Sequence, residues 1–172
     1  MDIVFYISSV VAVAGTLMVV TRTNAVHALL YLIVSLLAIA VIFFALGAPF
    51  VAALEVIIYA GAIMVLFVFV IMMLNLGPHA ARQERAWLRP ETWVGPTILG
   101  LVLLGELIYL VTLPIPAAGA GGSVSPKEVG IALFGPYLVG VELASMLLLA
   151  GLVGANHLGR RQDDGPGEGG RA

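Results

Sequence analysis

Three acidic residues lie inside long apolar stretches of this sequence and are the side chains best placed to do chemistry. They are Glu55, Glu106 and Glu142. An ionisable group at the centre of a bilayer costs about 2.5 to 3.5 kcal/mol on insertion scales, so such acids are functional candidates by default. No Lys or Arg lies inside the same stretches to pair with them. Each acid is therefore protonated, bonded to a neighbouring helix, or exposed to a hydrated proton path whose basic partners lie on other chains.

The segment after Glu55 carries the most information. Glu55 and Tyr59 are four residues apart, so on an α-helix their carboxyl and phenol groups share one face and can share water. Ala60, Gly61 and Ala62 follow at once and remove large side chains from the helix. Such a stretch permits close packing of a neighbouring helix, or it weakens the helix enough to form a π-bulge, a deformation frequent at functional sites. The spacing is compatible with both interpretations.

The composition excludes several kinds of chemistry. Of the 172 residues, 61% are hydrophobic and 10% are charged, whereas a soluble domain has roughly a quarter of its residues charged. The chain has no cysteine, which excludes disulfides, thiolate metal sites and Cys-ligated iron–sulfur clusters. A net charge of −2 makes nucleic acid an unexpected partner. Since phosphate loops, nucleophile–base pairs and dinucleotide fingerprints are also absent, we predict no catalytic residue, bound cofactor or metal in this chain.

The three histidines raise the hypothesis of a haem or copper site, because paired histidines on facing helices hold such groups. His27, His79 and His157 all lie at the ends of apolar stretches. We therefore interpret them as residues of the membrane interface.

Five apolar runs are long enough to cross a bilayer, whose hydrocarbon core of about 30 Å needs roughly 20 residues of helix. They span about 3–20, 28–46, 50–74, 93–113 and 133–158. None alternates with a period of two, so we predict an all-α, polytopic membrane domain over residues 1–159, embedded in a lipid bilayer, rather than a barrel. No Lys or Arg precedes the first run, which favours a retained span over a cleaved signal peptide.

Prolines near three of these runs are interpreted as residues of the first helical turn rather than as kinks. They are Pro49, Pro96 and Pro136. The loop 114–125 is rich in Gly and Ala and is expected to be flexible. The segment 160–172 is polar and rich in Gly, so we predict a disordered cytoplasmic tail.

The basic residues between the runs predict the orientation. With the N-terminus outside, seven of them fall on the inner side and one, Lys127, on the outer side. Basic loop residues are retained on the cytoplasmic side, so we expect the N-terminus outside and the C-terminus in the cytoplasm. The inner set is Arg22, Arg82, Arg85, Arg89, Arg160, Arg161 and Arg171.

Three segments resemble a known family. They run from Asn24 to Tyr31, from Ala53 to Val70 and from Val141 to Ala150. They closely resemble subunit J of the bacterial proton-pumping NADH-quinone oxidoreductase, respiratory complex I, whose mitochondrial equivalent is chain six of NADH dehydrogenase. The resemblance extends from the start of the chain to about Gly159, and the motif in the third run is highly specific. The fourth run, which contains Glu106, adds little to it.

The resemblance implies a five-helix subunit of the membrane arm in the bacterial cytoplasmic (inner) membrane. Its partners would be the quinone-site subunit, the antiporter-like subunits and a small neighbouring helical subunit. In this family the third helix carries a π-bulge near the tyrosine, and its conversion toward a regular α-helix is associated with opening or closing a hydrated proton route. Carried over, Tyr59, Ala60, Gly61 and Ala62 would form that switch beside Glu55, and Glu142 would be a further proton-path residue. NADH, FMN, the iron–sulfur clusters and the quinone would be bound by other subunits.

The leading hypothesis is therefore a non-redox subunit that couples electron transfer from NADH to quinone to proton translocation. A small subunit of a multi-subunit cation/proton antiporter is the alternative, because its intramembrane acids and basic inner loops would look much the same. A third hypothesis is a structural wedge that only holds helices together. Inverted repeats, which would favour a self-contained transporter, are not visible in the sequence.

Overall fold

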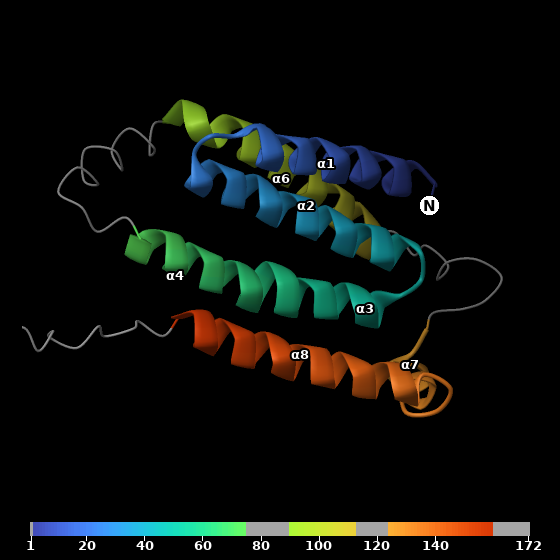
Figure 1. Cartoon of the computed structure of the whole chain (residues 1–172). Helices are drawn as coiled ribbons and strands as arrows, with labels where there is room; N and C mark the ends of the chain where they lie inside the picture. Colours follow the sequence, from blue (N-terminus) through green and yellow to red (C-terminus); the bar gives the residue numbers. More distant parts are fainter. Residues whose placement is uncertain (1, 75–89, 113–123, 160–172) are drawn as a thin grey trace, which may run out of the picture. The chain divides into compact units, whose positions relative to one another are not determined.

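In a computed structural model, which describes residues 2–74, 90–112 and 124–159, every long element is an α-helix or a π-helix (Figure 1). In chain order these are α1 (Asp2–Thr21), α2 (Ala25–Ala45), α3 (Pro49–Leu54), the π-helix η1 (Glu55–Ile63), α4 (Met64–Leu74), α6 (Pro90–Thr112), α7 (Pro126–Leu133) and α8 (Leu138–Gly159). The elements α3, η1 and α4 run on without a break and are together called the third helix. Five helices in the described residues are long and apolar enough to cross a membrane, which confirms the predicted all-α class and the five spans.

The chain divides into two compact units, one over 1–125 and one over 126–172. The first unit contains α1, α2, the third helix and α6. The second contains α7 and α8, which contact each other through the turn between them. The helix α2 is the centre of the first unit, since it contacts α1, the third helix and α6, and it is the most buried of the five spans.

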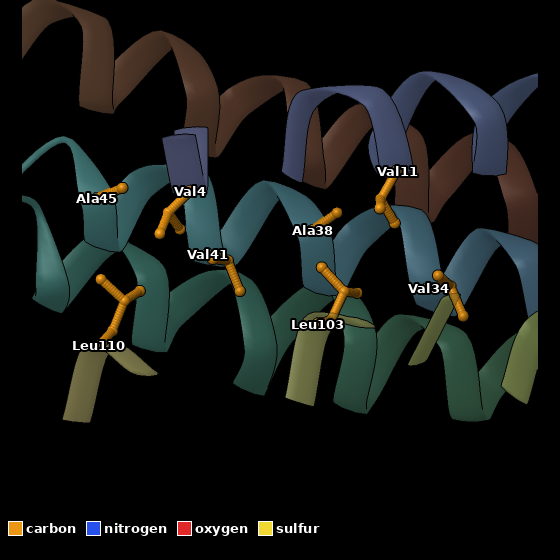
Figure 2. Packing of buried hydrophobic residues seen from close by; sticks show 8 residues of the cluster. All are labelled: Val4, Val11, Val34, Ala38, Val41, Ala45, Leu103 and Leu110. Carbon is orange, nitrogen blue, oxygen red and sulfur yellow. The ribbon is translucent and has the colours of Figure 1, made fainter. Parts of the chain in front are cut away.

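A cluster of buried apolar side chains holds α1, α2 and α6 together (Figure 2). On each helix its members are spaced so that they share one face of a 3.6-residue period. Ala38 of α2 is fully buried in this cluster, and so small a side chain lets a neighbouring helix approach closely. The cluster consists of Val4, Val11, Val34, Ala38, Val41, Ala45, Leu103 and Leu110.

Two of the three prolines lie elsewhere than predicted. Pro49 is in the first turn of its helix, as expected. Pro96 lies inside α6, because the helix begins at Pro90, ahead of the apolar run. Pro136 lies in the turn between α7 and α8, so the fifth span begins at Leu138 rather than near residue 133. Apolar runs mark the part of a helix that suits hydrocarbon, whereas hydrogen bonding decides where the helix begins and ends.

Several predictions fall where the structure says nothing. The tail 160–172, most of the loop 114–125 and His79 lie outside the described residues. The orientation of the termini across the membrane stays a prediction.

Gly95 is needed where α6 meets Tyr31 of α2. Tyr31 is 7% exposed, and its hydroxyl lies where a Cβ on Gly95 would stand. We expect Gly95→Ala to destabilise this packing by about 1 to 3 kcal/mol, the usual cost of overfilling a packed site. The steady-state amount of a tagged chain in membranes, and its resistance to proteolysis, would both fall.

The control for this change is Gly100→Ala, on the same helix, because nothing lies within 4 Å of a Cβ at position 100. Tyr31→Phe removes the hydroxyl and should partly rescue Gly95→Ala. Equal stability of the two alanine variants would show that Tyr31 moves aside without cost.

Candidate functional site

The small-residue stretch predicted in the third helix coincides with a π-helix. The segment Glu55–Ile63 has nine residues, EVIIYAGAI, and its flanking residues Leu54 and Met64 keep α-helical dihedral angles. A π-helix is bonded from residue i to i+5 and usually occurs as a short bulge inside an α-helix, frequently at functional sites. All five candidate residues of this helix, from Glu55 to Ala62, lie within it. No residue of the segment is fully buried in the described structure, although the segment contacts α2 and Ala60 and Gly61 are half-buried.

Gly61 lies at a point of the π segment where an added Cβ would be tight against the backbone. A Cβ on Gly61 would lie 3.1 Å from the carbonyl oxygen of Val56, which is tighter than ordinary van der Waals contact. Val56 is five residues earlier and is therefore the acceptor position of the π hydrogen-bond ladder. Glycine avoids this conflict, and it is about 1 kcal/mol worse than alanine in an α-helix, so it also weakens the competing form.

Glu55 and Tyr59 are accessible at the surface of the first unit. The Glu55 side chain is half-buried, and Tyr59 is 50% exposed. Neither side chain makes a hydrogen bond to the other in the described part of the chain.

The residues that flank the π segment are more buried than the segment itself. Met64, directly after it, is 1% exposed, and Ala52, just before it, is 6% exposed. Between them Tyr59 and Ala62 are exposed, and Ala60 and Gly61 are half-buried. Because both flanking residues are buried, a change of register in the segment has to be absorbed at one of these two ends.

Glu142 lies one turn into α8, in the second unit, and its side chain is exposed. Ser145 is in the next turn of the helix, and its hydroxyl donates to the backbone carbonyl of Glu142 over 2.8 Å. Glu55, Tyr59 and the small residues thus lie together in one segment of the first unit, whereas Glu142 lies in the second unit.

Glu106 is the acid that the structure buries, at 8% exposed. Its Oε2 accepts a hydrogen bond of 2.7 Å from Ser8 Oγ on α1, so the interpretation of a bond to a neighbouring helix holds for this acid. Ser8 is fully buried and is the partner that the sequence did not reveal. Its spacing between Val4 and Val11, both in the core cluster, is the signal that places it on the buried face of α1.

An apolar cavity of about 400 Å³ lies between α2, the third helix and α6. Its lining includes Ala53 and Val56 on the third helix and Leu103, Leu104 and Leu107 on α6. The lining residues are all apolar, so the cavity suits hydrocarbon rather than a polar ligand.

Five apolar helices, one of them carrying a π segment with a carboxyl and a phenol, define a multi-pass membrane protein. The chain also matches the family model described as NADH-ubiquinone/plastoquinone oxidoreductase chain 6, over residues 15–158. The chain belongs to this family, which confirms the resemblance stated from the sequence.

The chain is also similar to proteins from several bacteria, each of which carries the name NADH-quinone oxidoreductase subunit J. The Pseudomonas aeruginosa protein is 62% identical over 162 residues, covering 94% of this chain and 98% of the relative. The protein of Escherichia coli K12 is 58% identical over 166 residues, covering 96% of this chain and 90% of the relative. A Buchnera aphidicola protein, from subspecies Schizaphis graminum, is 52% identical over 162 residues, covering 94% and 99%.

Proposed function

We propose that this chain is a membrane-arm subunit of NADH-quinone oxidoreductase, respiratory complex I, and that it couples electron transfer to proton translocation. The π segment Glu55–Ile63 acts as a conformational switch on a hydrated proton route, and this segment is the observation that carries the proposal. NADH, FMN, the iron–sulfur clusters and the quinone are bound by other subunits. The complex lies in the bacterial cytoplasmic membrane, with this chain beside the quinone-site subunit, the antiporter-like subunits and a small helical subunit. Family membership supports this assignment over the antiporter alternative.

The switch works by changing the register of the helix. Conversion from i→i+5 to i→i+4 bonding shifts one end of the segment by one residue, which is a rotation of roughly 100° about the helix axis. Because Met64 is held in the core, the rotation falls on the exposed residues before it, Tyr59 among them. The phenol then turns toward or away from the route that water must fill.

Glu55 and Tyr59 supply the proton chemistry on this route. A carboxyl group takes up and releases a proton, and a phenol both donates and accepts a hydrogen bond. In the described structure no hydrogen bond joins the two groups, so water must bridge them when a proton passes. Glu142 of α8 is a further acid on the route.

A native gel of mildly solubilised membranes, stained for NADH dehydrogenase activity, tests the assignment. A tagged copy of this chain is expected to co-migrate with a large NADH-oxidising assembly. Migration in a smaller assembly without that activity would overturn the assignment and favour the antiporter alternative.

Glu55→Gln is expected to lower NADH:quinone turnover about threefold. This is far less than the ~10²-fold typical of losing a catalytic acid or base, because water and Tyr59 can carry the proton past position 55. Turnover and proton movement are measured together in vesicles. Glu55→Asp keeps a carboxyl group and is the control, so its turnover should stay near that of the wild type. Unchanged turnover and unchanged proton stoichiometry in Glu55→Gln would mean that Glu55 has only a structural role.

A further inference from the structure

A buried polar contact joins α1 and α6 in the first unit, away from the π segment. Glu106 and Ser8 face each other across the α1–α6 contact, with Oε2 and Oγ 2.7 Å apart. Each is surrounded by the core cluster, since Glu106 lies between Leu103 and Leu110 on one face of α6. Glu106 Oε1 is buried and has no hydrogen-bond partner among the described residues.

This environment does not suit a negative charge. A carboxylate here would have one hydroxyl donor and one bare oxygen in an apolar interior, where an unpaired charge is very costly. No cation is available in the spans, because α1, α2, the third helix and α6 contain no Lys or Arg.

Other titratable groups on the helices packed against α6 are also poorly placed to stabilise a charge. On α1, Tyr6 is 66% exposed and lies on another face from Ser8. On α2, His27 and Tyr31 lie near the beginning of the helix. Tyr31 lies next to Gly95 of α6, and the helical rise places Gly95 about 16 Å from Glu106 along α6. On α6 itself, Tyr109 is 50% exposed.

A neutral carboxyl group satisfies the contact better. With a proton on Oε2 the direction of this bond reverses, so that Oε2 donates to Ser8 Oγ across the same 2.7 Å, which is the usual length of an O–H···O bond. The Ser8 hydroxyl can then donate to a carbonyl one turn earlier in α1, as Ser9 does to the Phe5 carbonyl over 2.6 Å. Oε1 is then the carbonyl oxygen of a neutral carboxyl group and not an oxygen of a charged carboxylate.

We propose that Glu106 and Ser8 form a buried proton-binding site between α1 and α6, separate from the π segment, in which the carboxyl group holds its proton at neutral pH. The ligand is a proton, and Ser8 is the group that positions it. The site does not depend on the proposed switch, since it rests on the α1–α6 contact alone.

Infrared difference spectroscopy of the purified, assembled complex tests this site. The wild-type spectrum minus that of Glu106→Gln, at neutral pH, should contain the C=O stretching band of a protonated carboxyl group, moving to lower frequency in D₂O. Ser8→Ala keeps the carboxyl group but removes its partner, so the same band should move to higher frequency.

Glu128→Gln, which changes an exposed acid of α7 outside the five spans, is the control and should remove the paired bands of an ionised carboxylate. The same paired bands in the Glu106→Gln difference would overturn the proposal. If Glu106→Gln does not assemble, the Ser8→Ala difference decides: a shifted C=O band supports the site, and shifted carboxylate bands overturn it.

Discussion

Gly61→Leu is expected to leave the complex assembled and to lower its NADH:quinone turnover at least about tenfold. A Cβ at this position would lie 3.1 Å from the Val56 carbonyl oxygen, so we expect the side chain to penalise the π form unless that oxygen shifts by a few tenths of an ångström. The α form loses this conflict and gains about 1 kcal/mol in helix propensity when glycine is replaced. Since about 1.4 kcal/mol is a factor of ten in an equilibrium, propensity and steric conflict together shift the segment strongly toward α.

Assembly should survive this substitution because no residue of the π segment is buried in the described part of the chain. Gly61→Ala should give a smaller loss of turnover, near fivefold, since it adds the Cβ without the rest of the side chain. The measurements are activity per assembled complex, from a native gel, and proton movement per NADH oxidised in vesicles.

Gly100→Leu is the matched control for Gly61→Leu. Gly100 lies on α6, where nothing is within 4 Å of a Cβ and the apolar cavity offers room for the added side chain. Wild-type turnover in Gly61→Leu would remove the switch from the proposed function. Loss of the assembled complex, with Gly100→Leu intact, would identify the third helix as a structural wedge.

The five spans could be predicted from the sequence because the length of an apolar run is a direct consequence of bilayer thickness. Their ends could not, as Pro96 and Pro136 show. Pro96 lies inside α6 and Pro136 before α8, because a helix continues through polar residues as long as its hydrogen bonds are made. Hydropathy does not report those bonds.

The candidate site was predictable in part. The motif from Glu55 to Ala62 draws attention to the right segment, but its spacing suits close packing and a π-helix equally. The structure forms a π-helix there, and the close approach of residue 61 to the Val56 carbonyl oxygen is a contact that sequence spacing does not report. The bond between Ser8 and Glu106 joins residues far apart in the chain, and no local pattern pairs them.

Ala38→Leu is expected to reduce assembly of the subunit strongly. Ala38 is fully buried in the cluster that joins α1, α2 and α6 (Figure 2), and a leucine there adds three carbon atoms among side chains that already exclude solvent. Overpacking of this kind costs about 1 to 3 kcal/mol or more, and α2 is the helix on which the other three of its unit pack. We expect at least about a tenfold loss of the tagged chain from the NADH-oxidising band on a native gel.

Ala53→Leu makes the same change on the third helix, and here we expect assembly to be preserved. Ala53 lines the apolar cavity of about 400 Å³, which is large enough for the added carbon atoms, so assembly should stay near wild type. The same substitution thus compares a filled site with an open one in the same unit. If Ala38→Leu assembles as well as Ala53→Leu, then α1 can move away from α2 without cost, and the core cluster does not hold the first unit together.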